Sequence, residues 1–170
     1  MAIKIVKMDL PIGCNNVQLP DYITNSNYMN SLNNISNNLC FFGCIALAEE
    51  CRRDRYMNRA RELFHNFYRG SKQEGNYEGI QCFYQEGNKW VQDDSEISKY
   101  ELVDTRFAIN IYNVFEDHSC HEIIRSPHNP EDPKNPKPGE RKPIYLNLYL
   151  NHFSYITDPD QILGYRCVIE

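Results

Sequence analysis

Residues 144–152 carry the pattern that most restricts how this chain can fold. In the segment IYLNLYLNH, four apolar residues alternate with Tyr and Asn: Ile144, Leu146, Leu148 and Leu150 against Tyr145, Asn147, Tyr149 and Asn151. A period of two places alternate side chains on one face of an extended strand, whereas a helix repeats every 3.6 residues. The alternation predicts a β-strand over residues 144–152, and a helix there would contradict our interpretation of the whole chain.

A second strand is expected over residues 107–115, where Phe107, Ile109 and Ile111 share one face. The stretch HNPEDPKNPKPGERKP lies between the two strands, and we assign residues 126–143 to a Pro-rich loop because proline cannot donate to a sheet ladder. A direct loop connection makes the two strands neighbours. They should belong to one mixed or antiparallel sheet, and we favour an antiparallel pair.

Helical patterns precede the strands. Residues 1–35 form an Asn-rich, irregular or weakly helical lead-in, in which side-chain amides compete for backbone hydrogen bonds. Apolar residues then recur with helical spacing in 40–53 and in 56–69. A third helix is expected through Ile97, Tyr100, Glu101 and Val103, with caps offered by DDSE at 93–96. Helices early and paired strands late predict an α+β fold. A length of 170 residues suits one domain, spanning 1–170.

Composition excludes several classes of partner. The formal net charge is −5 and Lys and Arg form no long run, so nucleic acid is not an expected partner. No apolar run reaches the roughly 20 residues of a membrane span, so we expect no membrane partner. Seven Cys occur without a CxxC pair or a secretory signal, which predicts free thiols in a reducing compartment, the cytoplasm or nucleus. We expect a monomer.

Cys40 is the candidate nucleophile. It stands at the expected start of a helix after a polar loop, where unpaired N–H groups and the helix dipole lower a thiol's pKa and can hold an oxyanion. A thiol at a helix start should contribute little packing, so its removal should cost little stability. The alternative is a buried structural cysteine, which is the commoner role of free Cys. Cys44, on the apolar side of the same helix, is assigned to packing.

His152 is the candidate base, because a thiolate nucleophile needs an imidazole that a scaffold can hold in place. Among the five His, it alone ends a strongly apolar strand. A hydrogen-bonded structural histidine is the alternative. The segment DHSCHE, at 117–122, invites a zinc interpretation, but no second ligand pair with zinc spacing occurs, so neither metal nor cofactor is expected.

With these residues in view, the sequence resembles OTU (ovarian-tumour) cysteine proteases. NNLCFFGCIALAEE is similar to the family block in which the nucleophilic Cys begins a helix, and NLYLNHFSYI is similar to the block in which an apolar strand ends at the catalytic His. The resemblance covers residues 35–167. It is closer to the OTU-like segment beside protein-primed family B DNA polymerases of Polinton/Maverick-type elements and related viruses, which implies that the chain comes from a larger polyprotein.

The resemblance implies a papain-like, OTU-like fold and a deubiquitinase that cuts after the tail of ubiquitin or a ubiquitin-like protein, with Cys40 as nucleophile and His152 as base. The oxyanion would be held by the N–H of Cys40 with donors from Asn38 and Leu39. Asn37 and then Ser154 are the preferred groups to orient the imidazole, although Asn151, Asp158 and a plain Cys–His dyad stay open. Processing of a polyprotein, or an inactive OTU-like interaction domain, are the alternatives. The family's acidic residues are replaced by Asn37 and Ser154.

Overall fold

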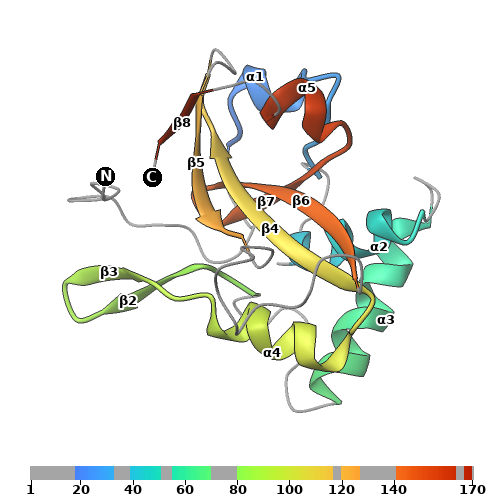
Figure 1. Cartoon of the computed structure of the whole chain (residues 1–170). Helices are drawn as coiled ribbons and strands as arrows, with labels where there is room; N and C mark the ends of the chain where they lie inside the picture. The colour runs from blue at the N-terminus through green and yellow to red at the C-terminus, as the bar shows by residue number, and fades with distance from the viewer. Residues whose placement is uncertain are drawn as a thin grey trace.

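The structure is a computed structural model that describes residues 18–32, 39–50, 55–69, 80–116, 120–126, 141–163 and 167–169. A mixed six-stranded sheet runs through it, with helices on both faces and a separate two-stranded hairpin (Figure 1). This arrangement is an α+β domain, as expected. None of the described helices is long and apolar enough to cross a bilayer.

The large sheet has the strand order β1-β7-β6-β4-β5-β8. Its strands are β1 (Met29–Asn30), β4 (Phe107–Val114), β5 (Cys120–Arg125), β6 (Lys142–Tyr149), β7 (His152–Ile156) and β8 (Cys167–Ile169). The hairpin pairs β2 (Phe83–Glu86) with β3 (Lys89–Gln92), and its turn includes Gly87 at φ +61°, a conformation that glycine adopts without strain.

The neighbouring strands β4 and β6 are parallel, so the antiparallel pairing that we favoured is wrong. Ile109 pairs with Ile144 and Ile111 with Leu146 in a parallel register. The reason is β5, which the sequence analysis did not assign: it pairs antiparallel with the other edge of β4. The chain reverses once into β5 and again before β6, so β6 returns in the direction of β4.

The predicted strand over residues 144–152 is in fact two strands. β6 ends at Tyr149, and β7 begins at His152 and pairs antiparallel with it. Leu150 and Asn151 make the two-residue turn with φ of 47° and 64°, the left-handed values that such hairpins use. His152 therefore opens a strand instead of ending one. Lys142 and Pro143, which we assigned to the Pro-rich loop, belong to β6. Residues 127–140 of that expected loop lie outside the described residues.

Five helices are described: α1 (Asp21–Thr24), α2 (Cys40–Ala48), α3 (Tyr56–Tyr68), α4 (Ser95–Val103) and α5 (Pro159–Leu163). The expected helix over 56–69 is confirmed to within one residue, and the helix expected through Ile97 and Val103 is confirmed as α4. The expected helix over 40–53 ends early, because Glu50 has φ 63° and its N–H bonds to the Leu47 carbonyl. The lead-in, expected to be irregular or weakly helical, contains the short helix α1 and the strand β1 among its described residues 18–32.

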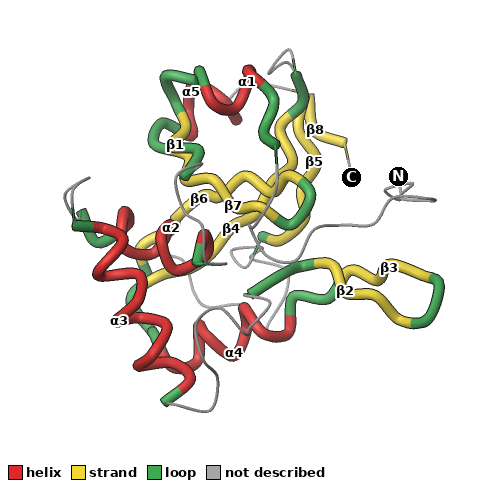
Figure 2. The backbone as a smooth tube through the Cα atoms, turned by 180° about the vertical axis from the view of Figure 1, so that it is seen from behind, coloured by secondary structure: helices red, strands yellow, loops and turns green. Residues whose placement is uncertain are grey.

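The two faces of the sheet carry separate apolar clusters. The alternate residues Ile144, Leu146 and Leu148 of β6 belong to the main core, which includes side chains of α2, α3 and α4. Tyr145 and Tyr149 point to the opposite face and pack against a smaller cluster with residues of α1 and α5. Figure 2 shows the helices divided between the two sides of the sheet. Alternate side chains of β6 therefore pack into two different apolar clusters, one on each face of the sheet.

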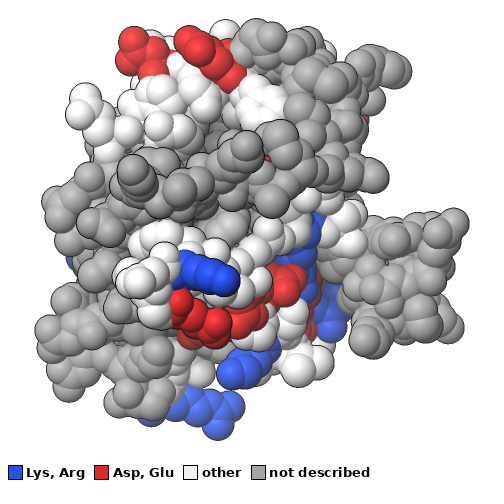
Figure 3. Space-filling view, turned by 90° about the vertical axis from the view of Figure 1, so that its left-hand side faces the viewer, with Lys and Arg blue, Asp and Glu red and all other residues white. Residues whose placement is uncertain are grey.

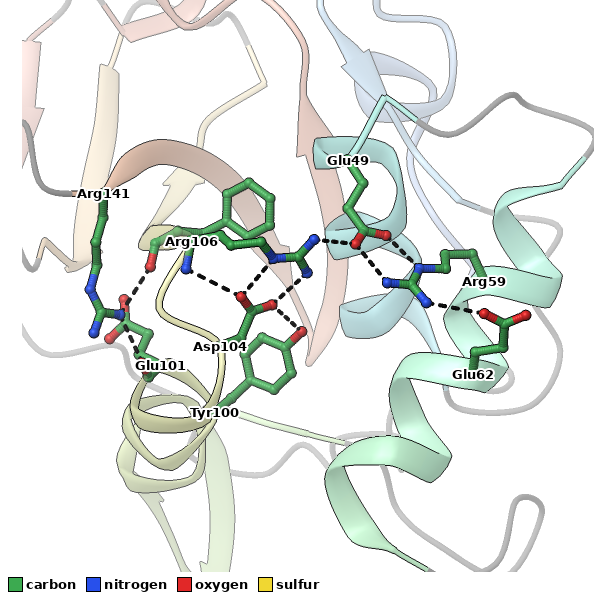
Figure 4. A network of polar contacts seen from close by, with 9 residues as sticks. Glu49, Arg59, Glu62, Tyr100, Glu101, Asp104, Arg106 and Arg141 are labelled. Atoms are coloured by element: carbon green, nitrogen blue, oxygen red, sulfur yellow. Dashed lines mark hydrogen bonds and ion pairs between the residues drawn. The ribbon is translucent and has the colours of Figure 1, made fainter.

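A polar network joins the helices α2 and α3 to the turn before β4 (Figure 4). The carboxylate of Glu49, at the end of α2, accepts hydrogen bonds from Arg59 at 2.7 and 2.9 Å and also pairs with Arg106. Arg106 in turn pairs with Asp104 at 2.8 Å, which accepts from the Tyr100 hydroxyl at 2.8 Å. Both arginines thereby fix the end of α2, the helix that begins with the candidate nucleophile.

The surface is mixed in sign. Figure 3 shows one face, on which Lys and Arg side chains lie next to Asp and Glu side chains. On the helix α3, Arg59 binds Glu49 and Glu62 at 2.7 and 3.0 Å. A phosphate-binding surface needs a concentration of positive charge, which this face lacks among the described residues.

Candidate functional site

Cys40 is the first residue of α2, as the sequence predicts. Leu39 precedes it as the N-cap residue, and its carbonyl accepts the N–H of Gly43 at 2.8 Å, which closes the first turn. The first N–H groups of a helix have no intrahelical acceptor, so this end of α2 presents donors and a partial positive charge. This end of α2 therefore has the N–H donors that we expect beside a thiol nucleophile.

The helix is buried on nearly all sides, because its residues are almost entirely apolar and small or aromatic. Phe41 and Phe42 make edge-on contacts with each other and with Tyr100, and Phe41 contacts the Phe153 ring of β7 at a centroid distance of 5.6 Å. These rings dock α2 against β7. Aromatic pairs of this geometry add to the energy of burial, so the position of the helix start relative to β7 is well fixed.

The docking brings Cys40 and His152 to one place, although 112 positions separate them in sequence. The N–H of Phe153 donates to Cys40 Sγ at 3.5 Å, so the sulfur lies against the peptide group that joins His152 to Phe153. Both side chains are buried, Cys40 at 1% and His152 at 2% exposure.

The two ring nitrogens of His152 have different environments. Nε2 lies 2.5 Å from the main-chain carbonyl oxygen of Ser31, next to β1. Nδ1 is buried and has no hydrogen-bond partner among the described residues. Because a carbonyl oxygen can only accept, the proton must sit on Nε2, and in the neutral ring Nδ1 is then unprotonated.

Of the residues considered for orienting the imidazole, Ser154 lies in this cluster. It is fully buried on the same face of β7 as His152, and its hydroxyl donates to the same Ser31 oxygen at 3.4 Å. Asn37 and Asn38 lie outside the described residues. Ser154 therefore supports the carbonyl that His152 contacts, and its hydroxyl donates to that carbonyl and not to the ring.

Asn151 and Asp158 have other partners. The Asn151 side chain accepts from the N–H of Phe83 at 3.2 Å and donates to the Phe83 carbonyl at 3.1 Å and to Gln81 at 3.0 Å. It thereby fastens the β6–β7 turn to the hairpin strand β2. The carboxylate of Asp158 accepts the N–H of Gln161 at 3.4 Å, at the start of α5. The Asn151 side chain therefore holds the β6–β7 turn against β2, although Asn151 directly precedes His152.

The Ser31 carbonyl is the site group that the sequence analysis missed. A main-chain oxygen has no residue-specific signal, and Ser31 becomes relevant only because β1 pairs with β7. Residues 28–32 show no strand pattern, so no local signal in the sequence marked this carbonyl.

The other described cysteines are not equivalent to Cys40. Cys44 is fully buried in the main core, as its assignment to packing requires. Burial, helped by the nearby Asp94 carboxylate, raises the pKa of the Cys82 thiol to about 12. Cys82 therefore stays protonated and is a poor nucleophile.

The histidine of the DHSCHE segment whose side chain is described is His121. It is buried at 3% exposure with its ring edge-on to Tyr112, and burial lowers its pKa. The side chains of His118 and Cys120 lie outside the described residues. Among the described residues, no group of three or more His, Cys, Asp or Glu is placed to hold a metal ion.

The packing of Cys40 differs from our expectation. Its side chain is only 1% exposed and belongs to the main core. Removing the sulfur should therefore lower the free energy of unfolding measurably. The same burial means that a substrate carbonyl can reach the sulfur only when the atoms that cover it move aside.

Comparisons of this chain with protein-family models, with curated proteins and with solved structures find no match.

Proposed function

We propose that this protein is a cysteine-type peptidase in which Cys40 is the nucleophile and His152 the general base. The observation that carries the proposal is the convergence of a helix-start thiol and a histidine strand: Cys40 Sγ lies 3.5 Å from the nitrogen that follows His152. A thiol nucleophile works with a histidine base that the same scaffold holds near it. The resemblance of the two sequence blocks to OTU proteases supports the same pair.

In the proposed reaction, His152 Nδ1 takes the thiol proton and Cys40 Sγ attacks the carbonyl carbon of the scissile bond. The tetrahedral oxyanion is held by the N–H groups at the start of α2, including that of Cys40. The Nδ1 proton then passes to the leaving amine as the C–N bond breaks, which leaves a thioester. Water, deprotonated by His152, attacks the thioester, and the C–S bond breaks to release the acid and restore the thiol.

The substrate that the resemblance implies is the C-terminal tail of ubiquitin or of a ubiquitin-like protein. The acidic balance of the chain, 23 Asp and Glu against 18 Lys and Arg, favours encounter with a basic tail. The burial of Cys40 and His152 favours a second candidate, an OTU-like interaction domain without catalysis, because a closed site cannot accept a substrate.

A ubiquitin carrying a C-terminal electrophile separates the two functions. The peptidase predicts a single covalent adduct, and peptide mapping should locate it on Cys40. Replacing His152 by Gln should slow adduct formation by on the order of 10²-fold while the fold is retained, since the base that makes the thiolate is lost.

The control is a small alkylating reagent applied to the same protein with and without denaturant, which shows whether Cys40 is accessible at all. Alkylation of native Cys40 without a ubiquitin adduct would point to a different substrate, such as a polyprotein junction. Failure of both reagents on the native protein would favour the interaction domain.

A further inference from the structure

We propose that the main-chain carbonyl of Ser31 is the positioning group of His152, in the place where a third side chain would otherwise be expected. The inference rests on the proposed function and names a part of that site. Its basis is the 2.5 Å contact between Ser31 O and His152 Nε2, with both residues buried. Such a contact fixes which ring nitrogen carries the proton, and the other nitrogen becomes the base.

The carbonyl is held in place by the pairing of β1 with β7. Met29 and Asn30 pair antiparallel with Ile156 and Tyr155, and the N–H of Thr157 donates to the Tyr28 carbonyl at 2.8 Å. Ser31 is the next residue after this ladder. The strand that carries His152 therefore also fixes the chain that orients it, so the two partners of the hydrogen bond move together.

Two further contacts fix the direction of the carbonyl. The Leu32 N–H donates to the Asn30 side-chain oxygen at 3.1 Å, and Leu32 has φ 54°, so the chain turns sharply directly after Ser31. The Ser154 hydroxyl donates to the Ser31 oxygen at 3.4 Å. A carbonyl oxygen has two lone pairs, so His152 and Ser154 can use it at the same time.

A main-chain carbonyl suits this task. It cannot donate, so it selects the Nε2–H form of the neutral ring, and it continues to accept from Nε2 when Nδ1 gains a proton during the reaction. The amide oxygen of Asn performs the same role in other Cys–His sites. The interpretation explains how His152 can be oriented when Ser154 and Asn151 bind other groups.

The tautomer of His152 tests the inference without reference to activity. Long-range ¹H–¹⁵N correlation spectra of the ¹⁵N-His-labelled protein report which ring nitrogen is protonated, and His152→Gln identifies the signal among the five His. The expected result is a neutral ring with a proton on Nε2 and none on Nδ1. An Nδ1–H ring would overturn the proposal.

A second experiment weakens the carbonyl itself. Replacing Leu32 by its α-hydroxy analogue turns the Ser31–Leu32 amide into an ester, whose carbonyl is a weaker acceptor. The substitution also removes the Leu32 N–H, so Asn30→Ala, which removes the acceptor of that same N–H, is the matched control. We expect kcat for a ubiquitin–fluorophore substrate to fall about tenfold with KM unchanged in the ester, and much less in Asn30→Ala. Equal effects in the two variants would overturn the proposal.

The two failures are distinguishable. If the wild-type protein has no hydrolytic activity but shows the Nε2–H ring, the proposed function fails and the contact stands as a structural one. If the protein is active and the ring is Nδ1–H, the function stands and the positioning by Ser31 is wrong.

Discussion

Cys40 and Cys44 form a matched pair for separating catalysis from packing. Both thiols lie on α2 about one turn apart, and both side chains are buried in the main core, at 1% and 0% exposure. Replacing either by Ala removes one sulfur atom from the same apolar environment. By the cost of a buried methylene plus a small cavity, each change should lower the free energy of unfolding by about 1–2 kcal/mol.

For a domain of this length, that loss corresponds to a fall in thermal midpoint of roughly 2–8 °C. Cys40→Ala should be the more destabilising of the two, because it also removes the acceptor of the Phe153 N–H. The assays are thermal unfolding followed by circular dichroism, and hydrolysis of a ubiquitin–fluorophore conjugate at least 15 °C below the lower midpoint.

The two variants should differ sharply in activity. Loss of the nucleophile should reduce kcat by about 10⁴-fold or more, whereas Cys44→Ala should retain activity within about threefold. Hydrolysis that survives Cys40→Ala refutes the assignment of the nucleophile. If Cys44→Ala loses activity at a temperature where it is fully folded, the packing of α2 affects activity. A loss of activity in Cys40→Ala would then no longer identify Cys40 as the nucleophile.

Three further predictions concern the scaffold. Asn151→Ala should lower the free energy of unfolding by about 2–4 kcal/mol in urea titrations, because the N–H and carbonyl of Phe83 in β2 lose their partner. The φ of 64° at residue 151 adds to the cost, since alanine adopts it less readily than asparagine. As a control, Asn66→Ala on the exposed side of α3 should change the free energy of unfolding by less than about 0.5 kcal/mol. Glu101→Leu should cost about 2–4 kcal/mol, because it removes one of the two carboxylates that pair with the Arg125 guanidinium, which keeps Asp94, and leaves the buried Ile109 N–H without its acceptor. Glu101→Gln keeps an acceptor, so its cost should be about 1–2 kcal/mol smaller, and equal losses would contradict this reasoning. The hydrogen bond from Arg59, together with Arg106, holds the pKa of Glu49 below its usual value near 4.5. The ionised Glu49 therefore stabilises the fold above pH 4.5, and this contribution is lost as the pH falls through the lower pKa of the folded state. The difference in stability between wild type and Glu49→Gln should shrink on acidification, and a difference that grows would contradict this reasoning.

The helices and the apolar strand were readable because local patterns specify them. Helical spacing over 56–69 predicts α3 to within one residue, and the alternation over 144–149 predicts β6 with its two faces. Cys40 at a helix start follows from the same kind of evidence, since a polar loop before an apolar helical pattern marks the first turn. Each of these features depends on neighbours within about ten residues.

Other features depend on contacts between distant segments. The turn at 150–151 was hidden because Leu150 continues the alternation, and only the antiparallel pairing of Tyr149 with His152 shows where the chain reverses. The parallel direction of β6 follows from an intervening strand that pairs on the far edge of β4. Strand order and direction are properties of pairing, which short-range periodicity does not encode.

The site divides along the same line. The identities of Cys40 and His152 are legible because their side chains have distinctive chemistry at patterned positions. The group that holds His152 is a backbone oxygen, and every residue carries one, so no residue type could mark Ser31 in advance. Only the pairing of β1 with β7 selects that carbonyl from 169 others like it, because hydrogen bonding by the main chain depends on where the fold places a peptide group and not on its side chain.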